Sequence, residues 1–308
     1  MIYFIIPAYN EAENIVKLTH EIAAHLLSSQ SKYEIVIIDD GSGDNTAEII
    51  QNMSKSHPLI CVKHETNKGV GQAFRTGFEN VLPRASDDDI VITKEADNTS
   101  DPAIMKDMIN DIQEGQDIIL ASCYAEAGGI EGTNFLRVFI SSIANFLLRR
   151  FFPVQGVCTY SSFYRAYKVS ILRKFFGTYG ENAIKEDGFA CMVEMLVKIH
   201  RITRKIKEVP MTLKGNLRKG KSKMRVIRTI ADYLKLIVRL KFQFFVTAVR
   251  TGFGSPTAEI TPLDQAKPIL KTPLLEHSQQ SNIQIAETKK PKLPADSELL
   301  KTKDTKGT

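Results

Sequence analysis

The chain has 308 residues, of which 43% are hydrophobic and 25% are charged, and its formal net charge at pH 7 is +6. This composition predicts a globular protein with a full core, in one large domain or two modest ones. The four cysteines lie far apart without a CxxC pair, which argues against a zinc cluster or a disulfide framework and favours reduced thiols in a cytosolic setting.

The first 121 residues alternate short apolar runs with stretches of helical periodicity. The start, MIYFIIPAYNEAENIV, lacks the basic region, long apolar run and cleavage site of a secretory signal. Strands are predicted at 2–6, 34–38, 59–63, 90–93 and 117–121, and helices at about 12–28, 44–55, 70–82 and 101–113. This alternation predicts an α/β protein with a mainly parallel sheet covered by helices on both faces.

Four loops follow these strands and should carry the ligand site, because open α/β sheets bind ligands at the carboxyl ends of their strands. They are PAYNE (7–11), DDGSGDNT (39–46), ETNKGVGQA (65–73) and KEADNTSD (94–101). The spacing of the second loop excludes an EF-hand, and the third has neither GxGxxG nor a P-loop. The third loop is therefore either a packing feature or a glycine-eased helix start that brings Lys68 to a diphosphate.

The fourth loop sets two carboxylates, Glu95 and Asp97, on either side of Ala96. At the end of a strand both can turn toward the same edge, where a hard ion such as Mg²⁺ or Mn²⁺ would find oxygen ligands. A solvated acidic loop with a helix cap is the alternative that the pair alone leaves open.

After residue 135 the alternation fades. The sequence predicts a helix rich in Phe and Leu from 135, then helices near 168–175 and 185–200, an edge-type strand at 206–213 and a basic helix at about 224–250. The stretch SSFYRAYKVSIL (161–172) is interpreted as a core segment with one snorkelling arginine. Residues 252–308 are predicted to be a disordered tail, and no stretch reaches about 18 uncharged apolar residues, the length of a membrane span.

Positive charge is concentrated between residues 201 and 250, with fifteen Lys and Arg against two acidic residues. This local balance of +13 predicts an anionic partner, such as phosphate, nucleic acid or an acidic lipid surface. Within it, a glycine-containing basic loop after Pro210 is either solvated or suited to close over a phosphate.

In this order and spacing the motifs resemble the family 2 glycosyltransferases of GT-A (Rossmann-like) fold, most closely the polyprenol-phosphate sugar transferases of the dolichol-phosphate mannosyltransferase type. The resemblance covers roughly residues 1–230 and includes IPAYNEAENI, IIDDGSGDNT, NKGVGQAFRTG, ITKEADNTSDP, NFLRVFISSIANFLL and EVPMTLKGNLRKGKSKM. It implies nucleotide binding by Pro7, Tyr9, Glu11, Asp39, Asp40 and Lys68, a Mg²⁺ or Mn²⁺ ion on Glu95 and Asp97, and phosphate contacts from Arg137, Arg165, Arg218, Lys221 and Lys223.

Three positions depart from the pattern of that family. Glu95 stands where the metal motif usually has Asp, Cys123 where an Arg is often found, and Thr159 where an Asp is common. An extra methylene at residue 95 moves the carboxylate oxygens by more than an ångström, a displacement to which catalysis is sensitive.

The resemblance implies an inverting transferase that moves a sugar from a nucleotide-diphosphate sugar to an acceptor, expected to be a polyprenyl phosphate. The expected organisation is a GT-A domain at 1–223, an interfacial amphipathic helix at 224–251 and a tail at 252–308, attached peripherally at the cytoplasmic face of a membrane. A catalytically degenerate binding protein for nucleotide sugars or lipid phosphates is the alternative. Nucleic acid is not expected as a partner, because no recognised module accompanies the basic block.

Overall fold

The computed structural model describes residues 1–27, 31–219 and 226–250. Its strands are β1 (Ile2–Ala8), β2 (Tyr33–Asp39), β3 (Leu59–Lys63), β4 (Ile90–Thr93), β5 (Ile118–Ser122), β6 (Gly129–Glu131), β7 (Arg165–Lys168), β8 (Ile206–Pro210) and β9 (Thr212–Lys214). Its α-helices are α1 (Ala12–Leu27), α2 (Thr46–Met53), α3 (Val70–Val81), α4 (Met105–Gln113), α5 (Phe135–Phe151), α6 (Val169–Tyr179), α7 (Cys191–Ile199) and α8 (Val226–Arg250).

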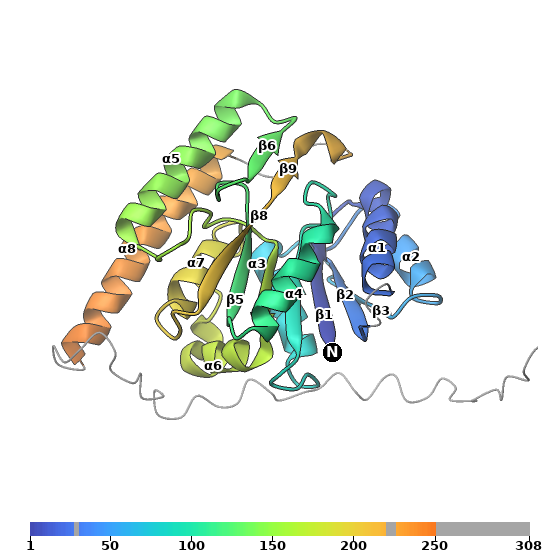
Figure 1. Ribbon diagram of the computed structural model, residues 1–308, viewed down its shortest axis with the longest axis horizontal. Coiled ribbons are helices and arrows are strands. Elements are labelled where there is room, and N and C mark those ends of the chain that lie inside the picture. The colour runs from blue at the N-terminus through green and yellow to red at the C-terminus, as the bar shows by residue number, and fades with distance from the viewer. Residues whose placement is uncertain (28–30, 220–225, 251–308) are drawn as a thin grey trace, which may run out of the picture. The chain divides into compact units, whose positions relative to one another are not determined.

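A seven-stranded sheet forms the centre of the structure, in the order β3-β2-β1-β4-β7-β5-β8 (Figure 1). All neighbouring pairs are parallel except those of β7, which runs antiparallel to both β4 and β5. The predicted mainly parallel sheet is thereby confirmed. Because β2, β1 and β4 are adjacent and parallel, the loops that follow them meet at one edge of the sheet.

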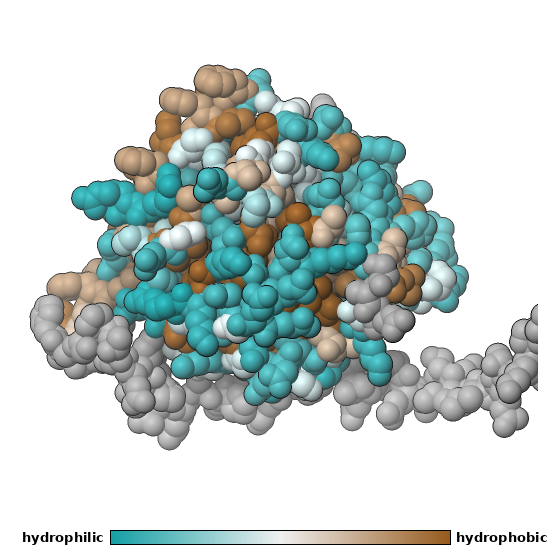
Figure 2. Space-filling view, in the orientation of Figure 1, coloured by the Kyte–Doolittle hydropathy of each residue, from teal (hydrophilic) through white to brown (hydrophobic). Residues whose placement is uncertain are grey.

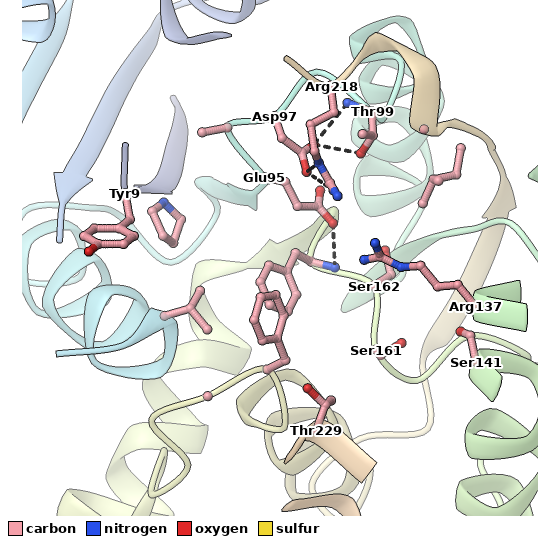
Figure 3. Close-up of a pocket in the computed structure, with 18 of the residues that line it drawn as sticks. Tyr9, Glu95, Asp97, Thr99, Arg137, Ser141, Ser161, Ser162, Arg218 and Thr229 are labelled. Carbon is pink, nitrogen blue, oxygen red and sulfur yellow. Dashed lines mark hydrogen bonds and ion pairs between the residues drawn. The ribbon is translucent and has the colours of Figure 1, made fainter. Parts of the chain in front are cut away.

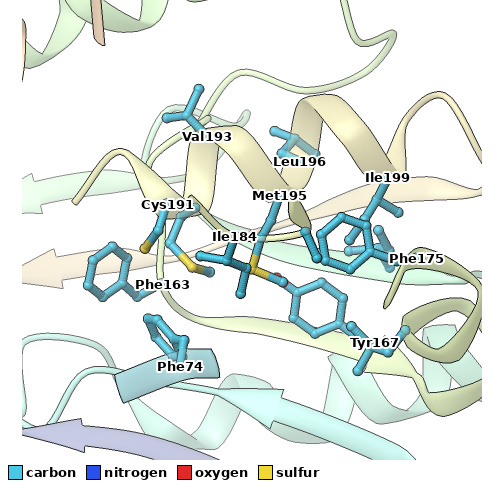
Figure 4. Packing of buried hydrophobic residues seen from close by; sticks show 14 of the residues in the cluster. Phe74, Phe163, Tyr167, Phe175, Ile184, Cys191, Val193, Met195, Leu196 and Ile199 are labelled. Atoms are coloured by element: carbon cyan, nitrogen blue, oxygen red, sulfur yellow. The ribbon is translucent and has the colours of Figure 1, made fainter. Parts of the chain in front are cut away.

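Alternate side chains of each strand pack on opposite faces of the sheet, as the two-residue strand period requires. Tyr3 and Ile5 of β1 belong to the core formed with α3, α6 and α7, whereas Phe4 and Ile6 belong to the core formed with α1, α2 and α4. Figure 4 shows part of the first core, where Met195 of α7 lies among aromatic side chains. Each fully buried large apolar side chain contributes about 2 kcal/mol relative to exposure.

The five strands and four helices predicted before residue 121 are confirmed, with boundaries within a few residues. The predicted helix at 185–200 begins only at Cys191, because the backbone of 185–187 is committed to other parts of the protein: Lys185 and Glu186 donate to the Glu194 side chain. The predicted strand at 206–213 divides at Met211, whose N–H donates to the Ser122 carbonyl, so that β8 and β9 pair in different sheets.

The long helices α5 and α8 lie side by side at one flank of the sheet (Figure 1). The inner face of α8 belongs to the core through Tyr233, Leu236 and Leu240. Within the described ranges, no helix is long and apolar enough to cross a membrane. The predicted tail at 252–308 and the predicted phosphate contacts Lys221 and Lys223 lie outside the described residues.

Candidate functional site

A cavity of about 1080 Å³ opens where the loops after β1, β2 and β4 meet. Its volume lies at the upper end of the range for small-molecule sites. The loop after β3, segment 185–189, and the first turns of α5 and α8 complete its wall. The predicted site residues that line it are Pro7, Tyr9, Glu11, Asp40, Lys68, Glu95, Asp97, Arg137 and Arg218.

The loop after β1 presents Tyr9 and Glu11 to the cavity. Tyr9 is 38% exposed, so its side chain can stack against a planar group in the cavity. Glu11 is buried and accepts a hydrogen bond from Asn14 Nδ2 at 2.6 Å, and its own N–H donates to Thr46 Oγ1 at 2.9 Å. These bonds fix the Glu11 carboxylate at the edge of the sheet.

Asp40 organises the loop after β3. Its carboxylate accepts the backbone N–H groups of Lys68 and Gly69, each at 2.9 Å, and contacts the Nδ1 atom of buried His64 at 2.7 Å. Asp40 lines the cavity, yet most of its hydrogen-bonding capacity holds the neighbouring loop. The predicted contact of Asp40 with a nucleoside therefore stays a prediction, whereas its hydrogen bonds to the loop after β3 are seen in the structure.

Asp39 is fully buried and does not line the cavity. Its Oδ1 atom accepts the Ser42 N–H at 3.0 Å, but its Oδ2 atom has no hydrogen-bond partner among the described residues. An unsatisfied buried acceptor costs about 1–3 kcal/mol. Because Asp39 lies outside the cavity wall, its predicted contact with a nucleoside stays a prediction.

Glu95 has the less committed carboxylate of the acidic pair. Its Oε1 atom lies 3.4 Å from the Phe163 nitrogen and its Oε2 atom 3.5 Å from Ser100 Oγ, both at the long limit of a hydrogen bond. Burial raises the pKa of Glu95, and the neighbouring Lys94 opposes that rise. A cation beside this carboxylate would stabilise its ionised form.

Asp97 is buried and fully engaged. Its Oδ1 atom accepts Thr99 Oγ1 at 2.7 Å and the Thr99 N–H at 3.1 Å, and its Oδ2 atom accepts Arg218 Nε at 2.9 Å as well as Arg218 Nη2. Burial acts to raise the pKa of Asp97, but Arg218 and the Thr99 hydrogen bonds outweigh it and lower that pKa. Asp97 is thus an anion paired with the cation of Arg218, which also lines the cavity.

Glu95 and Asp97 suit a divalent ion whose remaining ligands come from a substrate and from water. Within the described ranges, no three His, Cys, Asp or Glu side chains are grouped so as to hold a metal, so the protein would supply Glu95 and Asp97 alone. Mg²⁺ is commonly held by one or two carboxylates together with substrate phosphates and water. The weakly bonded oxygens of Glu95 suit this role, and Asp97 would join when Arg218 turns to a phosphate.

Arg137, in the first turn of α5, points toward the acidic pair from the opposite wall (Figure 3). Burial, and after it the charge of Arg218, lower the pKa of Arg137. Ser141, Ser161 and Ser162 line the same cavity, and Figure 3 draws Ser162 near the Arg137 guanidinium. Two arginines and several hydroxyls facing two carboxylates form a setting that can bind phosphate oxygens.

Cys123 and Thr159, two of the positions that depart from the pattern of the family that the sequence resembles, carry neutral side chains that contact other parts of the protein. Cys123 lines the cavity, and burial raises the pKa of its thiol to about 11. Thr159 is buried, with its hydroxyl 2.6 Å from Ser122 Oγ and its N–H donating to Glu208 at 2.7 Å. The cavity therefore carries neither the cation nor the carboxylate usual at these positions.

The predicted phosphate contact of Arg165 is wrong, as is its interpretation as a snorkelling side chain. Arg165 is fully buried at the start of β7 and is absent from the cavity wall. Its guanidinium donates to the backbone carbonyls of Ser162, Tyr160 and Met192 at 2.7–2.9 Å. These bonds hold the β7 approach against α7 and leave the guanidinium unavailable to a ligand.

Sequence reasoning missed the segment 185–189, which lines the cavity as an irregular loop. Its KEDGF sequence was absorbed into the predicted helix, although Gly188 was a signal for irregular backbone. His64 was also missed, and its signal was a polar residue directly after a strand. Ser162 lies in the stretch SSFYRAYKVSIL (161–172), which the sequence pattern assigns to the core, so its hydroxyl was not predicted to line a site.

Comparison with known proteins adds family information to this geometry. A family model described as "Glycosyl transferase family 2" matches residues 3–176. The chain is 30% identical over 237 residues to a dolichol-phosphate mannosyltransferase of Pyrococcus furiosus, a match that covers 77% of this chain and 62% of that protein. It is 27% identical over 210 residues to a polyprenol monophosphomannose synthase of Mycolicibacterium smegmatis, covering 68% of this chain and 75% of that relative. The chain thus spans less than two thirds of the length of the first of these relatives.

Among solved structures, the chain is similar to glucosyl-3-phosphoglycerate synthase from Mycobacterium tuberculosis in complex with Mn²⁺, uridine diphosphate and glucosyl-3-phosphoglycerate. The TM-score is 0.55 at 19% sequence identity, and the alignment covers 76% of this chain and 78% of that one. At this identity the likeness concerns the fold alone. Together with the mainly parallel sheet, it confirms the predicted GT-A fold.

Proposed function

Because the chain belongs to the family 2 glycosyltransferases, we propose that it moves a sugar from a nucleotide-diphosphate sugar to a polyprenyl phosphate, with inversion and with a divalent metal ion. The observation that carries this proposal is the cavity at the carboxyl edge of the sheet, where Glu95 and Asp97 face Arg137 and Arg218. A site of this kind can hold a diphosphate and a second phosphate at once.

The donor side is supported by the loops after β1 and β3. Tyr9 is partly exposed at the cavity and can stack on a base, and Lys68 brings a cation to the cavity. The similar synthase was solved with Mn²⁺ and uridine diphosphate, and the same classes of ligand are proposed here.

The chemistry would depend mainly on charge stabilisation. As the bond to the sugar breaks, negative charge gathers on the leaving diphosphate, and we assign its stabilisation to Lys68 and Arg218, which both line the cavity. A divalent ion held by Glu95 and Asp97 would add positive charge to the same diphosphate. A phosphate acceptor is already anionic, so no side chain has to remove a proton from it.

A lipid acceptor is supported by the outer faces of α5 and α8. Figure 2 shows hydrophobic side chains gathered over the end of the molecule where α5 lies. The exposed large apolar residues of the two helices are Phe135, Leu136, Phe139, Ile143, Phe146, Phe151, Leu234, Val238, Phe242, Phe245 and Val249. We call this set the apolar face.

The apolar face fits the surface of a membrane. Arg149 and Arg150 end α5, and Lys235 is exposed on α8, so cations accompany the apolar side chains. Helices of this composition lie in the interface with their apolar side toward the acyl chains, and anionic lipids attract their cations. The proposed location is therefore peripheral, at the cytoplasmic face of a membrane, and the two relatives named after lipid-linked mannose support a lipid acceptor.

Replacing Phe139 and Phe242 together by Ser is expected to weaken binding to vesicles of phosphatidylcholine and phosphatidylglycerol by about 30-fold. Each ring loses about 1 kcal/mol of burial in the interface. Co-sedimentation at several lipid concentrations measures the partition constant. Leu27→Ser, a change at an exposed apolar residue that ends α1, is the control and should bind as the wild type does. Equal binding of all three proteins would contradict the membrane assignment.

The function itself is tested by incubating the protein with a panel of nucleotide sugars, Mg²⁺ or Mn²⁺, and polyprenyl phosphates, followed by mass spectrometry of the lipids. A glycolipid product from one donor is the expected result. Binding of a nucleotide sugar without any product would instead favour the degenerate binding protein, which the neutral Cys123 and Thr159 positions make the second candidate.

A further inference from the structure

Glu194 of α7 is a fully buried carboxylate that gathers donors from three parts of the chain. Its Oε2 atom accepts the backbone N–H groups of Lys185 and Glu186 at 2.8 and 2.9 Å. Its Oε1 atom accepts Lys198 Nζ at 2.5 Å and Arg239 Nη2 at 2.9 Å. A buried carboxylate with two backbone and two cationic donors is a rigid anchor, because the removal of a cation leaves part of its buried negative charge uncompensated.

The anchor holds segment 185–189, which lines the cavity. The far side of that segment is bonded to the first turn of α3, which directly follows the loop that carries Lys68: the Asp187 carbonyl accepts the Gly71 N–H at 2.8 Å, and Asp187 Oδ1 accepts Gln72 Nε2 at 2.8 Å. The approach is so close that a Cβ atom on Gly71 would lie 1.8 Å from the Glu186 carbonyl oxygen. Segment 185–189 therefore supports the first turn of α3, and it adds to the hydrogen bonds by which Asp40 holds the loop directly before that turn.

Arg239 connects this arrangement to α8. Its Nη2 atom lies 2.8 Å from Glu186 Oε1 and 2.9 Å from Glu194 Oε1, so one guanidinium joins two carboxylates that would otherwise repel each other. Arg239 is partly buried, whereas the preceding residue, Val238, is 71% exposed and belongs to the apolar face. The same turn of α8 thus contacts the cavity wall on one side and the proposed membrane surface on the other.

We propose that Arg239 is a positioning residue that holds segment 185–189, and through it the loop carrying Lys68, in the geometry that binds the nucleotide-diphosphate sugar. The inference rests on the proposed function, because it assigns the donor to this side of the cavity. Arg239 does not line the cavity itself, so it acts through Glu186 and Glu194.

The test compares Arg239→Gln, Arg239→Lys and Lys235→Gln. The control Lys235→Gln removes one positive charge one turn earlier on α8, from an exposed side chain that forms no ion pair within the described ranges. Arg239→Gln is expected to raise the KM for the nucleotide sugar about tenfold while kcat at saturating donor changes less than about threefold, since the wall is displaced but the reacting groups remain. Arg239→Lys keeps a cation that can reach one carboxylate, and it should restore part of the affinity.

Equilibrium binding of uridine diphosphate and of guanosine diphosphate, each with Mn²⁺, is measured on the same proteins together with vesicle binding. Weaker binding of whichever nucleotide the wild type prefers, by about tenfold in Arg239→Gln alone and with vesicle binding unchanged, supports the inference. Equal donor affinity in Arg239→Gln and Lys235→Gln overturns it, as does a change confined to vesicle binding. If the wild type binds nucleotide but transfers no sugar, the proposed function fails while the nucleotide dissociation constants still decide the role of Arg239.

Discussion

Replacing Asp97 by Asn is expected to reduce the rate of sugar transfer by about 10³-fold. Asp97 is the one buried carboxylate of the acidic pair that the structure holds ionised, through Thr99 and Arg218. An amide of the same shape keeps a partner for Thr99 but removes the negative charge that a divalent ion requires and that orients the Arg218 guanidinium. Initial rates at saturating donor and acceptor, with Mn²⁺ varied, measure the loss.

The control for this change is Asp101→Asn, four residues along the same loop. Asp101 caps the short helix at Pro102–Ile104 by accepting the Ala103 N–H at 2.9 Å, and Asn is an equally good cap. This variant loses the same charge and should transfer sugar at a rate close to that of the wild type. If Asp97→Asn retained more than about a tenth of the activity, or if both variants fell equally, the role given to the acidic pair would be wrong.

The fold could be predicted from the sequence where the pattern is local. The apolar runs of β1, β2 and β4 are buried on both faces of the sheet, and such continuous apolar runs predict buried strands. The glycines and helix-capping residues between the runs predict the turns. The motifs in the connecting loops also predicted the family, which the match over residues 3–176 confirms.

The missed strand β7 shows where local patterns fail. Its four residues begin with Arg165, a charged side chain that sequence reasoning assigns to the surface. The guanidinium is buried because three backbone carbonyls, two from the preceding turn and one from α7, converge on it. These hydrogen bonds to Arg165 depend on segments that only the fold brings together, so no residue spacing in the sequence predicts them.

The same limit applies within the site. The sequence predicts Glu95 and Asp97 as a pair of metal ligands at a strand end, with Glu95 as the departure from the family pattern. The structure shows how they differ: within the described ranges Glu95 makes long contacts, whereas Asp97 is paired with Arg218, more than a hundred residues away. The longer side chain of Glu95 is thus the freer one. A metal ion that enters with a diphosphate would find Glu95 available and would compete with Arg218 for Asp97, which makes the phosphate the natural new partner for that arginine.

Replacing Arg137 by Ala is expected to reduce transfer to a short-chain prenyl phosphate in detergent by about 10²-fold, with the KM for the nucleotide sugar changed less than about threefold. Arg137 lies on α5, the helix that carries much of the apolar face, and it points from there toward the acidic pair (Figure 3). A lipid that enters from that face would present its phosphate to this guanidinium first. A charge-assisted, bidentate contact to an attacking phosphate both binds and orients it.

Two further variants distinguish a specific contact of the Arg137 guanidinium from a general effect of positive charge on α5. Arg137→Lys keeps the charge but loses the planar fork, so it should fall between Ala and the wild type. Arg150→Ala removes an exposed cation from the other end of the same helix and should leave transfer in detergent unchanged, because no membrane is present to attract it. An Arg137 variant that lost donor affinity while keeping its acceptor kinetics would place the arginine on the diphosphate instead. The acceptor would then have to approach from a wall other than α5, and the apolar face would lose its connection to the reaction.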